Sequence, residues 1–394
     1  MSGSVKVVGV GMIPFTKPGA SDSYDVMGET AARLALDDAG IAYDQIGQVY
    51  VGYVYGDSTA GQAAVYGLGM TGVPIINVNN NCSTGSSALF LARQAVESGM
   101  VDCALALGFE QMNPGALGSV FTDRLNPMKR MFKEMKTLQE LDSNAPGAAL
   151  YFGGAGREYA QEYGTKPETF AKISEKARRH AARNPYAVFR EELSVEQIME
   201  SPHIYGPLTR FQCCPPTCGA AAAVLCSEPL AKKLGLNNAI SIKGQAMTTD
   251  FPSTLEAHSM RKLVGYDMAK NAADAVYEQA GLGPEDVQVC ELHDCFTANE
   301  LITYEALGLT AEGSAEQFIW DGENTYGGRV VTNPSGGLLS KGHPLGATGL
   351  AQCTELVWQL RGDADDRQVP GARHALQHNL GLGGACVVTL YSNE

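Results

Sequence analysis

Apolar residues follow two alternating patterns along the chain, short continuous runs and longer segments with a helical period. The runs VVGVGM near the start, PIINV from Pro74 and GAAAAVLCS from Gly219 are typical of strands, and the last has the small residues that suit the centre of a sheet. AARLALDDAG, from Ala31, is typical of a helix that ends at a glycine. Strands that alternate with helices of about 10–15 residues predict an α/β fold, built of βαβ units with a mixed, largely parallel sheet that helices cover.

Several of these segments occur twice. AARLALDDAGIAYDQIGQVYVGY, from Ala31, resembles ADAVYEQAGLGPEDVQVCELHDCF, from Ala273, and GAAAAVLCS resembles GGACVVTLYS near the C-terminus. CSTGSSALFLARQAVESG, from Cys82, resembles HPLGATGLAQCTELVWQLRG, from His343, so the cysteine aligns with the histidine. An internal repeat predicts two halves related by a pseudo-twofold axis. Two sheets back to back would bury the apolar helices between them, and the two helix starts would meet near the axis.

The spacing between the repeated segments predicts an insertion in the first half. The copies are about 261 residues apart at Cys82 and His343 but about 165 apart at the last strand, which leaves roughly 96 extra residues in the first copy. We therefore expect an N-terminal half of residues 1–118 and 205–234, an inserted loop domain of residues 119–204 and a C-terminal half of residues 235–394. The insertion holds 13 of the 29 lysines and arginines, so it either binds a phosphorylated ligand or presents a solvated basic face.

Cys82 and His343 are suited to nucleophilic chemistry. Cys82 follows three asparagines at the start of a predicted helix, where free N–H groups and the helix dipole favour an anion and lower the pKa of a thiol. A buried structural cysteine is the alternative, since free cysteines are among the most buried residues. The repeat places His343 opposite Cys82, and a base beside a thiol is the usual pairing for a nucleophile.

A second group of titratable residues follows a predicted strand, in the segment VCELHDCFTANE. His293, Asp294 and Cys295 are consecutive there, which is dense for an ordinary turn. Zinc binding is the competing interpretation, but HxC supplies only two ligands and the sequence has no CxxC. A dinucleotide-binding glycine motif is also missing, because Gly9-Val-Gly11 continues as Met-Ile-Pro. We therefore expect no metal and no permanently bound cofactor.

Charge and cysteine content narrow the class of protein. A formal net charge of -14 argues against nucleic acid as the main partner, since phosphate backbones need clustered lysine and arginine. Ten cysteines without a secretion signal predict free thiols in a reducing compartment, and we expect a cytoplasmic protein. The last residues, YSNE, are not a peroxisomal address of the Ser-Lys-Leu type, and no apolar stretch is long enough to span a bilayer.

Four motifs point to a family. NNNCSTGSSAL, ELHDCFTANELITYEALG, NPSGGLLSKGHPLGATGLAQ and HNLGLGG occur in this order, and together they resemble the thiolases of the sterol-carrier-protein type over nearly the whole chain. The resemblance implies the thiolase fold, with a layered αβαβα core. It also implies an acyltransferase that uses coenzyme A as co-substrate. Such an enzyme cleaves a 3-oxoacyl-CoA into a shortened acyl-CoA and acetyl- or propionyl-CoA, in fatty acid, branched-chain or sterol side-chain degradation.

The resemblance also implies roles for individual residues. Cys82 matches the nucleophile, and His343, in the GHP motif, matches the residue that removes the thiol proton and then helps to hold the thioester oxygen. Most thiolases carry a second catalytic cysteine near the C-terminus, where this chain has Asn379. In this subfamily the HDCF motif supplies that cysteine, which makes Cys295 the acid and base and His293 a holder of an oxyanion or a water.

Three further expectations concern the oxyanion, the binding of coenzyme A and the assembly. The backbone N–H groups of Cys82 and Gly381 are candidates for the hole that holds the oxyanion of the acyl-enzyme. The basic insertion, residues 119–204, is a candidate for binding coenzyme A. Proteins with this fold usually dimerise, so the resemblance implies a homodimer, with a tetramer as the alternative.

Three other functions stay open. The lipid-transfer-protein aldolases resemble this subfamily and cleave 3-hydroxyacyl-CoA thioesters of sterol side chains with a small partner protein, but they do not depend on a nucleophilic cysteine. A decarboxylating condensing enzyme would use Cys82, His293 and His343 and leave Cys295 without a role. A lipid-binding protein on a retired thiolase core would have no need of reactive thiols. The presence of Cys82, Cys295 and His343 together favours thiolysis.

Overall fold

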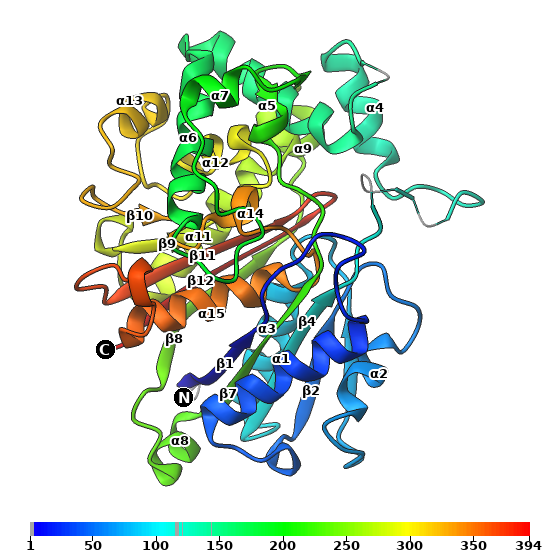
Figure 1. The fold of residues 1–394 in the computed structure, drawn as a ribbon, viewed down its shortest axis with the longest axis vertical. Coiled ribbons are helices and arrows are strands. Elements are labelled where there is room, and N and C mark those ends of the chain that lie inside the picture. Colours follow the sequence, from blue (N-terminus) through cyan, green and yellow to red (C-terminus); the bar gives the residue numbers. More distant parts are fainter. Residues whose placement is uncertain (1–3, 115–117, 120, 143) are drawn as a thin grey trace.

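In the computed structural model the described residues are 4–114, 118–119, 121–142 and 144–394 (Figure 1). The strands of the main sheet are β1 (Val5–Met12), β2 (Gln48–Gly52), β3 (Ile75–Val78), β4 (Cys103–Glu110), β7 (Gly219–Ser227), β8 (Ile240–Thr248), β9 (Val289–Glu291), β10 (Val331–Thr332), β11 (His374–Gly381) and β12 (Ala385–Ser392), and a separate pair is β5 (His203–Tyr205) and β6 (Leu208–Thr209). The helices are α1 (Tyr24–Ala39), α2 (Ala60–Tyr66), α3 (Thr84–Glu97), α4 (Lys129–Leu138), α5 (Gly147–Tyr163), α6 (Pro167–Ala181), α7 (Val195–Met199), α8 (Glu228–Leu234), α9 (Ser253–Glu256), α10 (Met260–Leu263), α11 (Tyr266–Ala280), α12 (Thr297–Ala306), α13 (Ala315–Trp320), α14 (Gly337–Ser340) and α15 (Thr348–Arg361). None of the helices within these ranges combines the length and the apolar character needed to cross a membrane.

The main sheet consists of two five-stranded halves with the same strand order. Over the described residues the halves are β1-β7-β4-β2-β3 and β8-β12-β11-β9-β10, so each strand of one half has a counterpart in the other. β1 and β8 join the halves edge to edge through two residue pairs. The predicted pseudo-twofold repeat is confirmed. The two sheets that we expected back to back are in addition continuous at one edge.

The pairing directions differ from the prediction. In the first half β7 runs antiparallel to both β1 and β4, whereas β2 runs parallel to both β4 and β3. The second half repeats this arrangement, so the prediction of a largely parallel sheet is wrong. The physical reason is that β11 and β12 form a hairpin with a turn at residues 382–384, and β4 and β7 are the corresponding pair. Residues 111–218 take the place of that turn in the first half.

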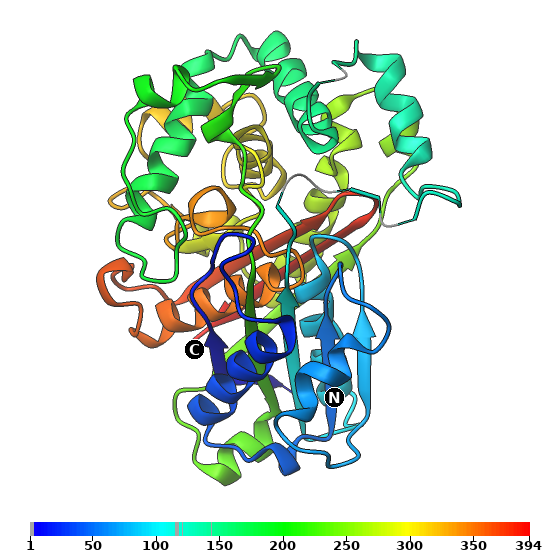
Figure 2. The same ribbon diagram turned by 45° about the vertical axis from the view of Figure 1, so that its right-hand side comes forward.

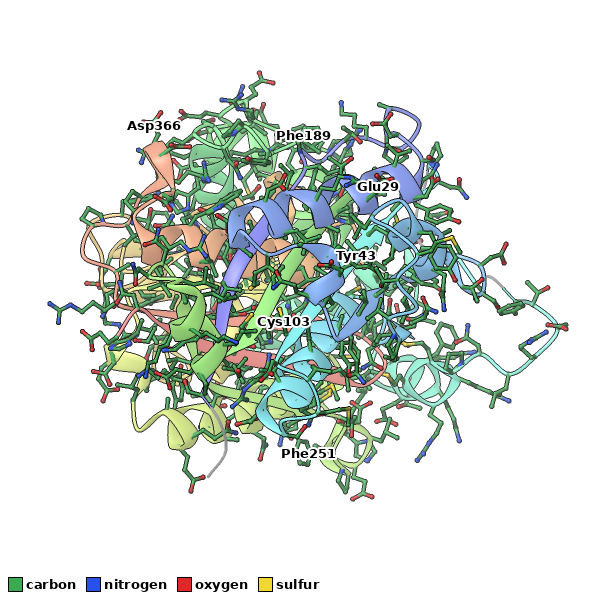
Figure 3. The ribbon with its side chains drawn as sticks, turned by 90° about the horizontal axis from the view of Figure 1, so that it is seen from below. Glu29, Tyr43, Cys103, Phe189, Phe251 and Asp366 are labelled. Carbon is green, nitrogen blue, oxygen red and sulfur yellow. The ribbon has the colours of Figure 1, made fainter. Side chains whose placement is uncertain are left out.

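Helices cover and separate the two halves of the sheet. α1 packs on β1 and β7 at the outer face of the first half, and α11 packs on β8 and β12 at the outer face of the second. α3 and α15 pack against each other between the halves. In the view from below, α1, which carries Glu29, lies across the outer face (Figure 3). Apolar clusters fill the interfaces between these layers, which confirms the predicted αβαβα core.

Local sequence explains how the corresponding outer helices end. α1 and α11 both finish with Ala-Gly, and Gly40 and Gly281 adopt φ angles of 62° and 65°. Glycine takes this left-handed conformation without the steric cost that a Cβ atom brings, and there its N–H satisfies carbonyl groups of the last turn. Each helix therefore stops at the same place in its half, and the chain turns back into the sheet.

The helices of residues 119–204 pack directly on the C-terminal half. α5 and α6 contact α12, and α6 also contacts α14, within the apolar cluster that includes α11. Lys176, on α6, is buried and pairs with Glu300 of α12, and its Nζ lies 2.6 Å from Oγ1 of Thr332. Part of the basic charge of this region is therefore structural. Lys129 and Lys133, in contrast, are exposed residues of α4. This helix, labelled in Figure 1, also lies at the edge of the ribbon in the turned view of Figure 2.

Candidate active site

Cys82 lies in the loop that leads from β3 into α3. The helix begins at Thr84 with Ser83 as its N-cap, so Cys82 precedes the first turn. Asn81 adopts a φ of 51°, a left-handed conformation that is uncommon outside glycine and is found at strained functional sites. Its side-chain amide donates to the carbonyl oxygen of Leu382 at 2.8 Å. This bond ties the Cys82 loop to the turn between β11 and β12 in the other half.

Glycines allow the starts of α3 and α15 to meet. A Cβ atom on Gly85 would lie 2.7 Å from the carbonyl oxygen of Gly346, and one on Gly346 would lie 2.3 Å from that of Phe109. Real Cβ atoms essentially never come this close to backbone atoms, so the approach depends on glycine. The expectation that the two helix starts meet between the halves is confirmed. Their meeting brings the loops of Cys82 and His343 together.

Cys82, His293 and His343 form one buried cluster. The Sγ atom of Cys82, one ring nitrogen of His293 and one ring nitrogen of His343 all lie within 4.8 Å of one another. The centroids of the two imidazole rings are 5.1 Å apart, and the rings are nearly perpendicular at 85°. The three residues come from separate loops, which follow β3, β9 and α14. The structure thus gathers residues that the sequence analysis singled out independently.

Burial sets the protonation of this cluster. It raises the pKa of the Cys82 thiol to about 12, with a smaller contribution from the carboxylate of Glu110. The same loss of water lowers the pKa of His343 to about 3. The expected lowering of the thiol pKa by the helix start is therefore wrong, because Cys82 lies before the first turn and is only 8% exposed. At neutral pH the resting pair is a thiol beside a neutral imidazole.

Cys295 lies in the loop before α12, next to the same cluster. Its carbonyl oxygen accepts the backbone N–H of Cys214 at 2.9 Å. Burial raises the pKa of the Cys295 thiol well above its usual value, and the neighbouring thiols of Cys214 and Cys82 raise it further. Cys295 is 4% exposed. It is therefore a protonated thiol at neutral pH, in the form that can donate a proton.

Gly381 and Asn379 border the cluster from the end of β11. A Cβ atom on Gly381 would lie 2.3 Å from the carbonyl oxygen of Asn80, so this strand end packs tightly against the Cys82 loop. The side-chain nitrogen of Asn379 lies 3.1 Å from the carbonyl oxygen of Cys82 and 3.1 Å from Nδ1 of His293. The asparagine at the place of the second thiolase cysteine therefore contacts two residues of the cluster.

Two family models match the chain in succession. The model for the thiolase N-terminal domain matches residues 5–229, and the thiolase C-terminal domain-like model matches residues 251–391. The chain belongs to the thiolase family. The two matches together include Cys82, His293, Cys295, His343 and Gly381.

The chain is also similar to curated proteins over nearly its whole length. Sterol carrier protein 2 of Oryctolagus cuniculus is 57% identical over 391 residues, which cover 98% of this chain and 71% of that protein. The acetyl-CoA acetyltransferase of Methanothermobacter thermautotrophicus is 34% identical over 394 residues, which cover 98% of this chain and 99% of that protein. The first similarity confirms the resemblance to the sterol-carrier-protein type.

Solved structures share the fold of this chain. An Ltp2-ChsH2(DUF35) aldolase has a TM-score of 0.84 at 23% identity, over 99% of this chain and 98% of that chain. Human mitochondrial 3-ketoacyl-CoA thiolase in complex with CoA has a TM-score of 0.72 at 18% identity, over 99% of this chain and 98% of that chain. These likenesses concern the fold alone, and they confirm the predicted thiolase fold.

Glu110, at the end of β4, was not found from the sequence. Its carboxylate accepts backbone N–H groups from Val54 at 3.1 Å, Tyr55 at 2.9 Å and Gly346 at 3.0 Å. It therefore joins the loop after β2 to the start of α15, and burial raises its pKa to about 7. The only signal in the sequence is one acid at the end of an apolar strand, which does not identify its distant partners.

The donor atoms of the cluster raise the question of a metal. One sulfur and two imidazoles, from Cys82, His293 and His343, are ligand types that zinc accepts. A thiol beside a neutral imidazole is better suited to proton transfer during nucleophilic attack.

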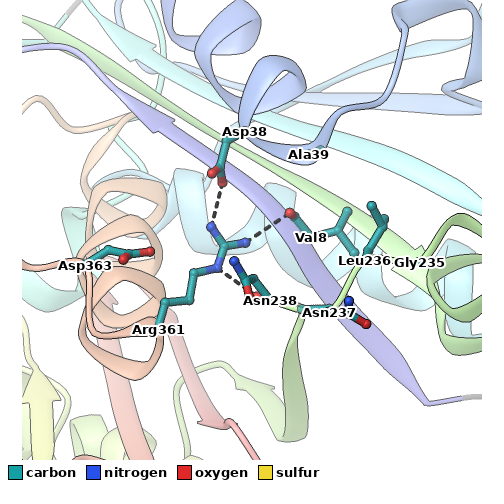
Figure 4. Close-up of a pocket in the computed structure, with 10 residues that line it drawn as sticks. Val8, Asp38, Ala39, Gly235, Leu236, Asn237, Asn238, Arg361 and Asp363 are labelled. Carbon is teal, nitrogen blue, oxygen red and sulfur yellow. Dashed lines mark hydrogen bonds and ion pairs between the residues drawn. The ribbon is translucent and has the colours of Figure 1, made fainter.

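A pocket of about 350 Å³ lies away from the cluster, between α1, α15 and the segment that follows α8 (Figure 4). Arg361 spans it and donates to the carboxylate of Asp38 at 2.7 Å and to the carbonyl oxygens of Val8 at 3.0 Å and Asn238 at 2.8 Å. These bonds engage three nitrogens of the guanidinium group. Arg361 therefore links the two halves of the chain, and the pocket is separate from the cluster of Cys82, His293 and His343.

Proposed function

We propose that this chain is a 3-oxoacyl-CoA thiolase, an acetyl-CoA C-acyltransferase that works through an acyl-enzyme on Cys82. Its substrates are 3-oxoacyl-CoA thioesters from the degradation of fatty acids, branched chains or sterol side chains, and coenzyme A is the co-substrate. The observation that carries the proposal is the approach of Cys82, His293 and His343 to within 4.8 Å. Similarity to an acetyl-CoA acetyltransferase over nearly all of both chains supports acyl transfer.

In the first half-reaction His343 removes the proton of Cys82 as the sulfur attacks the 3-oxo carbon. Its neutral imidazole is in the form that accepts a proton, because burial keeps its pKa at about 3. The bond between the α- and β-carbons then breaks, and the Cys295 thiol gives its proton to the α-carbon of the departing acetyl- or propionyl-CoA. His293 donates a hydrogen bond to the oxyanion that forms.

In the second half-reaction coenzyme A releases the shortened acyl group. The Cys295 thiolate takes the proton of the coenzyme A thiol, whose sulfur attacks the carbonyl carbon of the acyl-enzyme. The carbon–sulfur bond to Cys82 breaks, and the proton returns from His343 to the Cys82 sulfur. The N–H groups of Cys82 and Gly381 hold the oxyanion in this step, and the packing of Gly381 against the Cys82 loop supports that assignment.

The remaining parts of the proposal concern binding and assembly. Residues 119–204 form a unit inserted within the N-terminal half, residues 1–118 and 205–234, and residues 235–394 form the C-terminal half. The inserted unit binds the phosphates of coenzyme A, and the exposed Lys129, Arg130 and Lys133 of α4 support the assignment.

The enzyme works as a homodimer, or as a tetramer of two dimers. It works in the cytoplasm, since ten free cysteines in the described chain suit a reducing compartment.

The test is a panel of straight, 2-methyl-branched and steroid-side-chain 3-oxoacyl-CoA thioesters, each with and without coenzyme A. We expect cleavage that depends on coenzyme A, and mass spectrometry should find the shortened acyl group on Cys82 when coenzyme A is omitted. Cys82→Ala should abolish both signals. Cys103→Ala, which removes a buried thiol of β4 instead, is the matched control and should keep both.

The same panel includes the matching 3-hydroxyacyl-CoA thioesters. Their cleavage by the Cys82→Ala protein would replace thiolysis with retro-aldol cleavage, a reaction that needs no nucleophilic thiol. Absence of acylation of Cys82 by every member of the panel would favour a non-catalytic lipid-binding protein.

A further inference from the structure

The hydroxyl of Thr348 determines which nitrogen of His343 carries a proton. Thr348 is the first residue of α15, and its hydroxyl donates to the carbonyl oxygen of Pro344 at 2.9 Å. The hydroxyl has one hydrogen, so with that hydrogen directed at Pro344 the same oxygen accepts from Nδ1 of His343 at 2.7 Å. Nδ1 of His343 therefore bears the hydrogen and Nε2 the lone pair. Nε2 is buried and has no hydrogen-bond partner among the described residues.

The amide of Asn379 determines the opposite arrangement on His293. Its nitrogen faces the carbonyl oxygen of Cys82, which can only accept, and its oxygen accepts the hydroxyl of Ser86 at 2.8 Å. The amide orientation is therefore unique. The nitrogen that lies 3.1 Å from Nδ1 of His293 is a donor, so Nδ1 of His293 must accept and Nε2 must carry the hydrogen.

A buried chain of hydrogen bonds holds Asn379 in this orientation. The side-chain nitrogen of Gln377 donates to the carbonyl oxygen of Gly349 at 2.6 Å and to the hydroxyl of Ser86 at 2.8 Å. The hydroxyl of Tyr391 donates to the side-chain oxygen of Gln377 at 2.5 Å. Because Ser86 accepts from Gln377, its own hydrogen is free for Asn379. Each hydrogen bond in this series therefore has one direction, because the series ends on backbone carbonyl oxygens, which can only accept.

We propose that Thr348 and Asn379 are positioning residues that hold the two active-site imidazoles in opposite tautomers. His343 then presents a lone pair on Nε2 as the base for the Cys82 thiol, and His293 presents an N–H on Nε2 as the donor to the oxyanion. The assignment of the two roles rests on the proposed thiolase reaction. The tautomers themselves follow from the hydrogen bonds of the resting protein.

The tautomers can be measured without any substrate. Histidine labelled with nitrogen-15 in the ring distinguishes protonated from unprotonated nitrogens in long-range proton–nitrogen spectra of the full chain, and single histidine replacements assign the signals. We expect a protonated Nδ1 on His343 and a protonated Nε2 on His293. The same tautomer on both rings, or the reverse pattern, would overturn the inference even if thiolase activity were present.

Two substitutions separate the two roles. Thr348→Val leaves Nδ1 of His343 without an acceptor, and we expect a loss of kcat of roughly 10²–10⁴-fold, the range of a lost general base, with slower alkylation of Cys82 by iodoacetamide. Thr348→Ser keeps the hydroxyl and should have the wild-type kcat and the wild-type rate of Cys82 alkylation. Asn379→Asp cannot donate to Nδ1 of His293, and we expect a roughly 10²–10³-fold loss of kcat with little change in KM. Its spectrum should show Nδ1 of His293 protonated and His343 unchanged.

Thr354 provides the matched control on the same helix. It is buried, and its hydroxyl donates to the carbonyl oxygen of Leu350 at 2.9 Å, the same bond to the preceding turn that Thr348 makes. Thr354→Val should therefore leave kcat, alkylation and both tautomers unchanged. If Thr348→Val behaves like Thr354→Val, the positioning role is wrong. If the wild-type chain shows the expected tautomers but cleaves no 3-oxoacyl-CoA, the proposed reaction fails and the tautomer assignment stands.

Discussion

Gly346 offers a sharp test of how the two halves are held together, through the substitution Gly346→Ala. The new Cβ atom would lie 2.3 Å from the carbonyl oxygen of Phe109, 2.7 Å from that of Gly52 and 2.8 Å from Cα of Tyr53. All three are backbone atoms, so no side chain can rotate away. The change introduces no backbone strain of its own, because Gly346 is not among the residues with positive φ.

The structure sets the size of the effect. Ordinary van der Waals contact begins at 3.4 Å, so the start of α15 must move by about 1 Å to relieve the contact at 2.3 Å. Inserting a methylene into a packed interior costs about 1–3 kcal/mol, and three rigid contacts place this case near 3 kcal/mol. The same movement displaces His343, and a misplacement of about 1 Å can cost roughly 10²-fold in rate.

The assay is urea unfolding of the full chain, followed by kcat on the best substrate of the panel. Gly147→Ala is the control, because a Cβ atom there meets nothing within 4 Å and the residue opens α5. It should stabilise the protein by about 0.4–1 kcal/mol and leave kcat unchanged. Surface substitutions usually change the free energy of unfolding by no more than about 0.5 kcal/mol. A change of this size or less in the Gly346→Ala protein would show that the two halves do not meet as described.

Three further predictions concern buried charge. Lys176→Met leaves Glu300 buried without its cation and should lower the free energy of unfolding by about 3–5 kcal/mol in urea, whereas a loss below about 1 kcal/mol would mean that water reaches the carboxylate. The pH profile of kcat/KM should show no break near 6.5, the usual imidazole pKa, because burial lowers the pKa of His343 to about 3, and a break there in the wild type would show that burial does not lower this pKa. Burial raises the folded-state pKa of Glu110 to about 7, so the folded state binds the proton more tightly and the stability from this group is lost as pH rises from about 4.5 through about 7. Glu110→Gln should therefore flatten that part of the stability curve, measured by urea unfolding between pH 5 and pH 8, and an unchanged slope would place the titration elsewhere.

Repetition and local motifs were readable from the chain alone. The match of CSTG with HPLG placed Cys82 opposite His343, and the Ala-Gly pairs at the ends of α1 and α11 marked equivalent helix ends. Such signals can be read from the sequence because a helical period and a glycine cap depend on neighbouring residues. A glycine at a close contact is needed simply because a Cβ atom does not fit there. They were sufficient for the layered fold and for the residues that gather at the cluster.

Burial and long-range pairing became visible only in the folded chain. The antiparallel pairing of β4 with β7 depends on a partner more than one hundred residues away, and Glu110 finds its donors on two distant loops. The pKa of the Cys82 thiol is raised, whereas the sequence predicted that it would be lowered. Desolvation in the core is the largest cause of this shift, and the helix begins only two residues further on. Side-chain chemistry of this kind depends on which atoms surround a group, and neither water exclusion nor hydrogen-bond direction can be read from residues that are adjacent in sequence.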